Sequence, residues 1–360
     1  MAWCSNRHPV GTVPDRGSRS ARRIELGRGG GRRHLPHHPG GDRGEPARLV
    51  ATRETDAARH RPARGPAVVS VATVRELLHQ QFPRWADLPI TNGPSAGVGN
   101  ALFRLGDDLV VRLPLHPGSA AAVDVELTWL PWLAPQLPLA VPVPVAAGAP
   151  AGVFPRPWAV FRWIRGVGVD AYQDLDLMDV AVRLGRFVAA LRDIDTAGAP
   201  ASLRPHPLRG DDGGVRTDIR ALGAAGVIDE ALATAVWDGA QAALAAASYH
   251  VPVWIHGDVF PMNLLVDRGA LSAVIDFDLM GAGDSAVDMV PAWTLLTAKT
   301  RPLFREASGV DDDTWARGRG WALKAGLGAI RRFGVHSHHP RAVTGRYALS
   351  HTIADHRQAT

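Results

Sequence analysis

The sequence has a single cysteine, Cys4, among its 360 residues. One cysteine can form neither a disulfide framework nor a cysteine-based zinc site. Long apolar runs are missing as well: no stretch reaches about 18 apolar residues without a charge or a break, so we expect no transmembrane helix and no membrane partner. The N-terminus lacks the apolar segment of a secretory signal. These absences favour a cytoplasmic protein.

Lysine is scarce too, because only Lys299 and Lys324 occur and arginine carries the rest of the positive charge. That charge is unevenly placed. Residues 1–65 contain 14 Arg against 6 Asp and Glu, a net charge of +8. Residues 165–320 contain 14 Lys and Arg against 22 Asp and Glu, a net charge of −8. The high isoelectric point therefore reflects one terminal segment and is weak evidence for nucleic-acid binding.

Residues 1–65 are rich in Arg, Gly, Pro and His. Their apolar residues are too scattered to form a buried face, so we expect a disordered basic tail. Three interpretations remain open: an arginine-rich tail for nucleic acid, a solvated tail without a ligand, and a wrongly chosen start codon. The segment lacks the interleaved aromatic residues that stack on bases, which favours the last two and predicts no specific nucleic-acid partner.

The next region, residues 71–164, has the pattern of a small β-rich lobe. We expect a short helix over 74–82, a hairpin with strands 101–105 and 109–113, a helix over 120–133 and a strand over 158–164. Before the last strand, Pro142 and Pro144 predict an extended connector, because each proline fixes its own φ and restricts the residue before it.

Residues 165–340 are predicted to form a larger, mostly helical lobe. An apolar stripe with steps of three and four residues marks one helix: Leu177, Val180, Leu184, Phe187 and Leu191. A second helix is expected over 229–247, then strands around His256 and over 271–275, then helices to about residue 333. Residues 341–360 are expected to be a C-terminal helix or tail. A β-rich half followed by a helical half predicts an α+β fold with two lobes.

The stretch between Trp254 and Asp288 carries the chemistry. Asp258 is followed five residues later by Asn263, then by an apolar strand, a turn at 267–270, and a second apolar strand that ends in Asp276. This order is typical of phosphoryl transfer. The oxygens of Asn263 and Asp276 suit Mg²⁺, and Asp258 would face the substrate hydroxyl and accept its proton.

Each of these residues also has an ordinary structural interpretation. An isolated Asp is usually a solvated charge or a helix cap, but Asp258 and Asp276 lie between apolar strands, where an unpaired carboxylate is costly. That favours a functional role for both. His256 is expected to orient the loop, and Asp284 and Asp288 are expected to brace it or cap a helix. Asp278 is either a neighbour of the metal or a turn residue.

The motifs of this stretch resemble those of the aminoglycoside phosphotransferase and choline kinase family, which shares the protein-kinase catalytic core. The resemblance rests on His256-Gly257-Asp258 with Asn263, on Ile275-Asp276-Phe277, and on Gly283-Asp284-Ser285-Ala286, where Ser285 replaces the usual proline. It extends over about residues 80 to 335 and is more specific than a lone glycine-rich loop. It implies a protein-kinase-like fold, ATP or GTP with Mg²⁺ as cofactors, and a small-molecule hydroxyl as acceptor.

The resemblance also implies where the nucleotide binds. Gly97, Gly99 and Asn100 would cover the phosphates. The strand lysine of kinases is missing, and Arg112 stands in its place with Glu126 as its partner; a guanidinium can bind phosphate through a bidentate fork. Alternatively, Arg112 is a surface charge on an edge strand. Phe161 and Trp163 would belong to the hinge that holds the base, or else to the core.

The acceptor is less well defined. The acidic C-terminal half favours a cationic or polyhydroxylated compound, such as an aminoglycoside, an amino sugar or a choline-like molecule. Residues 310–315 either line the acceptor site or begin a helix with a cap. Trp293, Trp315 and Trp321 either stack on a ring or pack in the core. A catalytically silent kinase-like protein that binds a nucleotide or ligand is the main alternative, and the oligomeric state is left open.

Overall fold

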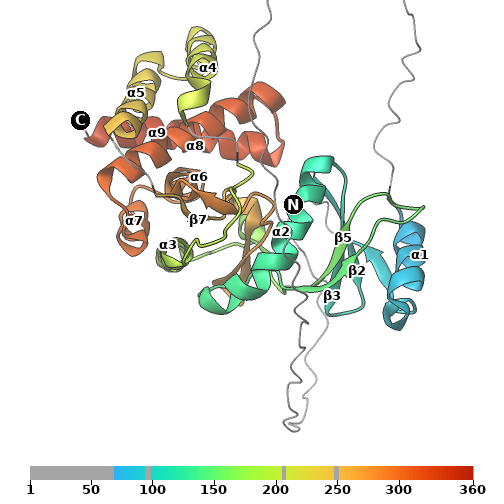
Figure 1. The fold of residues 1–360 in the computed structure, drawn as a ribbon. Coiled ribbons are helices and arrows are strands. Elements are labelled where there is room, and N and C mark those ends of the chain that lie inside the picture. Colours follow the sequence, from blue (N-terminus) through green and yellow to red (C-terminus); the bar gives the residue numbers. More distant parts are fainter. Residues whose placement is uncertain (1–68, 94–98, 205–207, 247–250, 360) are drawn as a thin grey trace, which may run out of the picture. The chain divides into compact units, whose positions relative to one another are not determined.

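The computed structural model describes residues 69–93, 99–204, 208–246 and 251–359. The expectation for residues 1–65 lies outside this part. Within it, a sheet-containing region is followed along the chain by a helical region (Figure 1). This arrangement confirms the predicted α+β fold with a β-rich first half and a larger helical second half.

Five antiparallel strands form the main sheet in the order β1-β2-β3-β5-β4. The strands are β1 (Ile90–Asn92), β2 (Asn100–Leu105), β3 (Leu109–Pro114), β4 (Pro144–Gly148) and β5 (Trp158–Arg162). The predicted hairpin turns at Gly106, whose φ of +57° suits glycine. Every residue of β3 is buried, because β3 is the central strand and has side chains packed on both faces.

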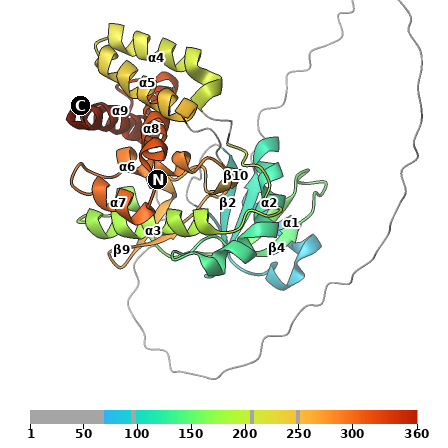
Figure 2. The ribbon, with the colours of Figure 1, turned by 60° about the vertical axis from the view of Figure 1, so that its left-hand side comes forward.

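Two helices flank this sheet (Figures 1 and 2). Helix α1 (Val71–Gln81) begins at a capping box made by Ser70 and Thr73, and its apolar residues pack with those of the sheet. Helix α2 (Pro117–Leu133) starts three residues earlier than predicted, because a proline suits the first helical position, where its missing N–H has no helical partner. Glu126 lies on the buried side of α2.

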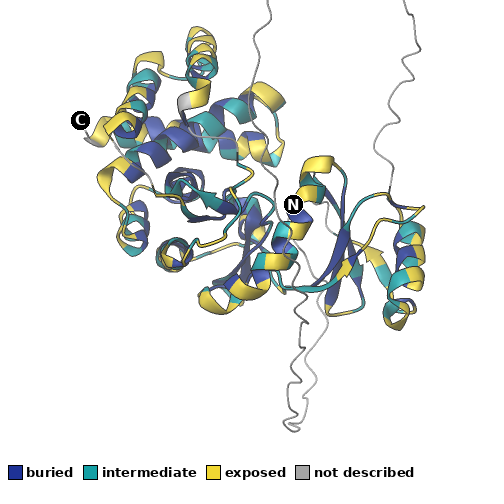
Figure 3. Cartoon of the chain, viewed as in Figure 1, coloured by how far each residue is buried: buried dark blue, intermediate teal, exposed yellow. Residues whose placement is uncertain are grey.

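The helical region contains the following helices: α3 (Leu177–Asp193), α4 (Asp212–Ala224), α5 (Glu230–Ala246), α6 (Pro291–Thr294), α7 (Arg301–Ser308), α8 (Asp312–Phe333) and α9 (Pro340–Ala359). Four of the five predicted stripe residues of α3 are fully buried, and Leu177 at its first turn is only half-buried. Figure 3 shows buried residues along the strands and on the inner sides of the helices. Figures 1 and 2 show α4 and α5 at the end of this region that lies away from the main sheet.

Two small sheets frame the chemically informative stretch. One pairs β7 (Val253–Ile255) with β10 (Gly281–Gly283), and the other contains β6 (Val167–Gly168), β8 (Leu264–Asp267) and β9 (Ala270–Val274). The β8–β9 hairpin is the predicted one. Its turn residues Arg268 and Gly269 have φ values of +50° and +86°, as a tight two-residue hairpin turn requires.

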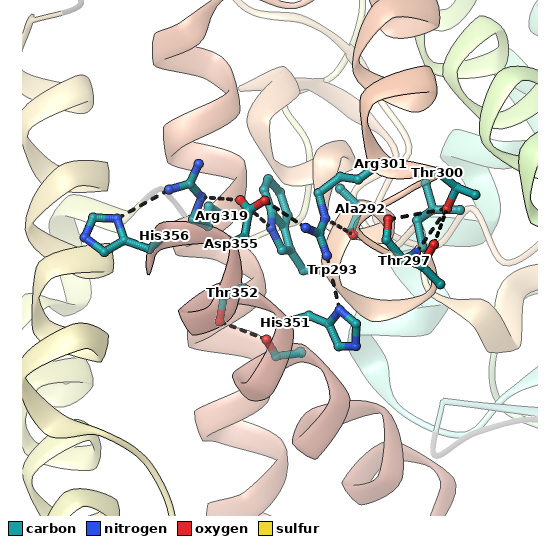
Figure 4. Close-up of polar contacts among 12 residues, drawn as sticks. Ala292, Trp293, Thr297, Thr300, Arg301, Arg319, His351, Thr352, Asp355 and His356 are labelled. Atoms are coloured by element: carbon teal, nitrogen blue, oxygen red, sulfur yellow. Dashed lines mark hydrogen bonds and ion pairs between the residues drawn. The ribbon is translucent and has the colours of Figure 1, made fainter. Parts of the chain in front are cut away.

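Helix α9 is held against the rest of the helical region by Asp355 (Figure 4). Asp355 accepts hydrogen bonds from Trp293 Nε1 at 3.1 Å and Arg301 Nη1 at 2.8 Å, and Arg319 Nε lies 3.0 Å from it. Arg301 also donates to Nδ1 of His351, at 3.2 Å. The segment expected to be a C-terminal helix or tail is therefore a docked helix. None of the helices in the described ranges has both the length and the apolar character needed to cross a membrane.

Candidate active site

The loop between β7 and β8 carries Asp258 and Asn263. Asn263 ends a short 3₁₀ turn, Pro261–Asn263. Through Nδ2 it donates to the backbone oxygen of Asp258 at 2.9 Å and to the carboxylate Oδ2 at 3.2 Å. These bonds fix the two residues relative to each other. They use the amide nitrogen, so the side-chain oxygen is the atom that Asn263 can offer to a metal ion.

His256 connects this loop to the strand that leads into Asp276. Its Nδ1 accepts a hydrogen bond from the backbone N–H of Asp258 at 3.1 Å, so the ring proton must sit on Nε2. Nε2 lies 3.1 Å from the carbonyl oxygen of Ile275, to which it donates. The side chain is fully buried, and burial lowers its pKa to about 4. His256 is therefore neutral and orients the loop.

Asp288 braces the same loop. Its two carboxylate oxygens accept hydrogen bonds from the backbone N–H groups of His256 and Gly257, each at 2.8 Å. Burial raises the pKa of Asp288 to about 7, and these two hydrogen bonds oppose the rise. Gly257 has a φ of +82°, and a Cβ there would come within 2.9 Å of the Leu279 carbonyl oxygen. The loop therefore needs glycine at this position.

Asp276 directly follows Ile275, whose backbone N–H donates to the carbonyl of Asn263 at 2.9 Å. The φ of Asp276 is +68°, a left-handed conformation that costs a non-glycine residue on the order of 1 kcal/mol or more. Burial and then the charge of Asp278 raise its pKa to about 7, against the opposing effect of Arg112. The Asp276 carboxylate is buried and has that of Asp278 as a neighbour, so a bound cation would stabilise its ionised form.

This donor set fits magnesium. Asp276 and Asn263 supply a carboxylate and an amide oxygen on the wall of one cavity. Over the described ranges, no group of three or more His, Cys, Asp and Glu side chains is arranged to hold a metal. Mg²⁺ in kinases does not need three protein side chains, because nucleotide phosphates and water complete its coordination.

Arg112 lies on the central strand β3 with its side chain only 8% exposed, so the alternative of an edge-strand surface charge is wrong. Its Nη1 donates to Glu126 Oε1 at 2.9 Å, and its Nη2 bonds both Glu126 Oε2 and Asp278 Oδ1, the latter at 2.7 Å. The expected pair with Glu126 is thus present. Burial alone would lower the pKa of Arg112, but Glu126 and Asp278 outweigh it, so the guanidinium stays charged.

Asp278 joins three parts of the site. Besides Arg112, it accepts a hydrogen bond from Nδ2 of Asn100 at 2.9 Å. It therefore ties the start of β2 and the middle of β3 to the segment that follows Asp276. In the part of the chain that the structure describes, Arg112 Nε is buried and has no hydrogen-bond partner. A phosphate oxygen would satisfy this donor.

The predicted nucleotide-binding residues are only partly brought together. Gly97 lies outside the described residues. Gly99 and Asn100 line the cavity from the start of β2, and Phe161 lines it from β5. The ring of Trp163 is not part of the lining; it lies against the guanidinium of Arg104, whose Cζ is 4.0 Å from the ring centroid. Of the two hinge aromatics, therefore, only Phe161 lines the cavity.

The cavity has a volume of about 780 Å³ and extends from the main sheet to the α8–α9 junction. Asp258, Asn263, Asp276 and Arg112 all line it. Besides Arg112, and Arg162 at the end of β5, the lining contains three arginines that were not singled out from the sequence: Arg204, Arg332 and Arg341. Arg204 Nη1 donates to Asp258 Oδ1 at 3.1 Å. No spacing relates these arginines to the catalytic motifs, so the sequence offered no signal for them.

The structure decides between the alternatives left open on the acceptor side. Residues 310–315 do not line the cavity; Asp311 caps α8 by accepting a hydrogen bond from the Thr314 N–H at 2.6 Å. Trp293 and Trp315 pack against each other in the core, with ring centroids 4.7 Å apart, and Trp321 is buried as well. The acidic excess of the C-terminal half is also not found at the cavity, where the lining carboxylates belong to the transfer site itself: Asp258, Asp276 and Asp278.

Solved structures with this fold include several antibiotic phosphotransferases. The GDP complex of aminoglycoside 2'-phosphotransferase-IIIa is 18% identical, with a TM-score of 0.58 over 79% of this chain and 98% of that one. Spectinomycin phosphotransferase with ADP and spectinomycin is 10% identical, with a TM-score of 0.53 over 81% and 98%. Macrolide 2'-phosphotransferase from Brachybacterium faecium is 22% identical, with a TM-score of 0.50 over 80% and 95%.

At these identities the structural similarity shows the fold. No curated protein sequence matched the chain. A family model described as the phosphotransferase enzyme family matches residues 91–321, well over half of the chain and the whole stretch from β2 to the catalytic loop and Asp288. The chain belongs to the phosphotransferase enzyme family.

Proposed function

We propose that this small-molecule phosphotransferase uses ATP or GTP with Mg²⁺ and transfers the terminal phosphate to a hydroxyl of its acceptor. The observation that carries the proposal is the position of Asp258, Asn263 and Asp276 on one cavity wall, with Arg112 on the same cavity. Asn263 and Asp276 would hold Mg²⁺, which when bound neutralises charge on the phosphates. Asp258 orients the hydroxyl and accepts its proton.

Arg112, braced by Glu126, is proposed to bind the nucleotide phosphates, and Gly97, Gly99 and Asn100 are proposed to cover them. Phe161 and the backbone near Trp163 would hold the base at the junction of an N-terminal lobe, residues 71–164, and a C-terminal lobe, residues 165–340. Related folds have been solved with GDP, ADP and ATP, which supports a nucleotide at this end of the cavity.

The acceptor is proposed to be a hydroxylated small molecule. Enzymes with this fold have been solved with kanamycin and spectinomycin, so an antibiotic hydroxyl is one candidate class. Aminoglycosides, macrolides, amino sugars and hydroxy acids belong in the first screen.

The test is nucleotide consumption by the purified full chain, with and without Mg²⁺, across that screen. We expect turnover that depends on Mg²⁺ and on an acceptor, and that is lost in Asp276→Asn. The matched control is Asp267→Asn, at the far end of the same β8–β9 hairpin, with a side chain 42% exposed; it should turn over like the wild type. Nucleotide binding without turnover under any condition would support the silent binding protein instead.

A further inference from the structure

We infer that the acceptor carries an anionic group, a carboxylate or a phosphate ester, together with an apolar portion, and that Arg332 and Arg341 bind the anionic group. This inference rests on the proposed function, because it assigns the part of the same cavity that lies beyond Asp258. It differs from what the acidic composition of the C-terminal half favoured, namely a cationic or polyhydroxylated acceptor over an anionic one.

The cavity continues past the transfer residues to the place where α8 ends and α9 begins. Apolar side chains form much of its wall there: Ala325, Ala329, Phe333, Pro340 and Ala348. Helices α8 and α9 cross closely, because Gly326 and Gly345 face each other; a Cβ on Gly326 would lie 3.0 Å from the Gly345 carbonyl oxygen. This wall is therefore a fixed surface that can contact the body of a small molecule.

The charged groups at this end are arginines. Arg332, in the last turn of α8, and Arg341, in the first turn of α9, both line the cavity, and across the described ranges neither guanidinium has a carboxylate within ion-pair distance. The carboxylates that could have served them are engaged elsewhere. Asp258 is paired with Arg204, and Asp278 with Arg112. Among the residues that the structure describes, a polyamine would find no unpaired carboxylate at the α8–α9 end.

Arg341 lines the same cavity as Asp258 and Asp276. The backbone around Arg341 cannot supply the contacts to an anion. His339 already accepts hydrogen bonds from the N–H groups of residues 341, 342 and 343, at 3.2, 2.8 and 3.1 Å. Recognition of an anion therefore falls to the two guanidinium groups, which present fork-shaped donors to carboxylate or phosphate.

The test compares related acceptors of different charge. Glucuronate, glucose and glucosamine form one set, and 3-phenyllactate, its methyl ester and phenylalaninol form a second set with an apolar ring; glucose 6-phosphate separates phosphate from carboxylate, and kanamycin represents a polycation. Each is assayed for acceptor-dependent nucleotide consumption and, independently of turnover, for binding by calorimetry to the full chain. We expect the anionic member of at least one set to bind best, by about tenfold or more over its neutral and cationic analogues, as the loss of a charge-assisted bond predicts.

Variants assign the effect to the two arginines. Arg341→Gln and Arg332→Gln should each reduce affinity for the preferred anion roughly tenfold and leave the KM for the nucleotide unchanged. The control is Arg331→Gln, one residue away on α8, whose guanidinium pairs with Asp218 and does not line the cavity; it should keep the preference.

The inference is overturned if a cationic or neutral member binds best in both sets, if the three charge classes bind alike, or if kanamycin is the preferred acceptor. It is also overturned if Arg341→Gln raises the KM for the nucleotide and not for the acceptor, because Arg341 would then serve the transferred phosphate. A failure of the proposed function looks different: no acceptor supports turnover, while calorimetry still reports which charge class binds.

Discussion

Both carboxylate oxygens of Asp258 are held by neighbouring side chains. Arg204 Nη1 lies 3.1 Å from Oδ1, and Asn263 Nδ2 lies 3.2 Å from Oδ2. The two bonds fix the orientation of the carboxylate and keep an arginine charge beside it. The proposed base is therefore held in place by a residue on a different segment of the chain.

Asp258→Ala should reduce kcat by a factor of about 10² to 10⁴, the usual contribution of a positioned general base. Affinity for the nucleotide should change much less, because its proposed ligands are elsewhere. Arg204→Ala keeps Asp258 but removes one of the two hydrogen bonds that orient its carboxylate, so it should lower kcat by a smaller factor. Steady-state kinetics of the two variants measure this. An Asp258→Ala enzyme with wild-type kcat would remove the proposed base.

Arg112→Ala should both weaken nucleotide binding and destabilise the fold, since it leaves Glu126, which is fully buried, without its cation. Breaking a buried ion pair from one side typically costs about 3–5 kcal/mol. Arg112→Lys should retain part of each property. The double variant Arg112→Met/Glu126→Leu removes both charges, so it should be more stable than Arg112→Ala while still binding nucleotide poorly. Urea denaturation and nucleotide titration separate the two effects; normal nucleotide affinity in the double variant would mean that another group binds the phosphates.

The buried His256 should make the protein less stable in acid. Burial lowers the pKa of its imidazole in the folded protein to about 4, below the ordinary value of 6.5. Between these values the unfolded chain binds a proton that the folded chain does not, so stability is lost as the pH falls from 6.5 toward 4, by up to roughly 3 kcal/mol. Glutamine does not titrate, so the unfolding free energy of His256→Gln should vary less over the same pH range. Parallel pH profiles for the two proteins would show that His256 does not titrate in this way.

Asp355→Asn should lower the free energy of unfolding by about 3 kcal/mol, because Arg301, only 4% exposed, loses the carboxylate that neutralises it (Figure 4). Asp238→Asn is the comparison, since Asp238 pairs with Arg216 at a site where its side chain is 54% exposed; there the cost should be within about 1 kcal/mol. Equal losses in urea denaturation would mean that Asp355 does not anchor α9.

Gly328→Leu should obstruct the acceptor without harming the fold. Gly328 lines the cavity, and a Cβ at this position would have no atom within 4 Å. Leucine also has a higher helix propensity than glycine, by up to about 1 kcal/mol. The matched variant Gly326→Leu, two residues earlier, would meet Leu349 at 2.9 Å and should instead be destabilised. The readouts are acceptor KM and thermal stability, and an unchanged acceptor KM in Gly328→Leu would place the acceptor elsewhere.

The elements predicted best are those whose signal is local. The β8–β9 hairpin, the α3 stripe and the catalytic loop follow from turn residues, apolar periodicity and fixed spacing. Strand β4 (Pro144–Gly148) was expected only as an extended connector, because Pro142 and Pro144 lack the backbone N–H that a paired strand donates. In the structure β4 is an edge strand, a position where a missing N–H is tolerated.

The rest of the site depends on contacts between distant segments. Asp278 had two interpretations from sequence, and only its bonds to Arg112 and Asn100 show which parts it joins. Arg204 and Arg341 come from segments without a motif. The charge of a whole lobe was also a poor guide to one cavity, because most of the carboxylates that make the C-terminal half acidic lie outside the lining.

The wall formed by the end of α8 and the start of α9 has a consequence for how this enzyme can diversify. Gly328, Arg332 and Arg341 all follow residue 321, where the match to the family ends, whereas Arg112, Asp258 and Asp276 lie within it. On the proposed roles, phosphate transfer and acceptor choice are encoded in consecutive stretches of the gene. Exchanging the last two helices is then a route to a new substrate range that leaves the chemical step intact, provided that the replacement for α9 keeps Asp355 as the partner of Arg301.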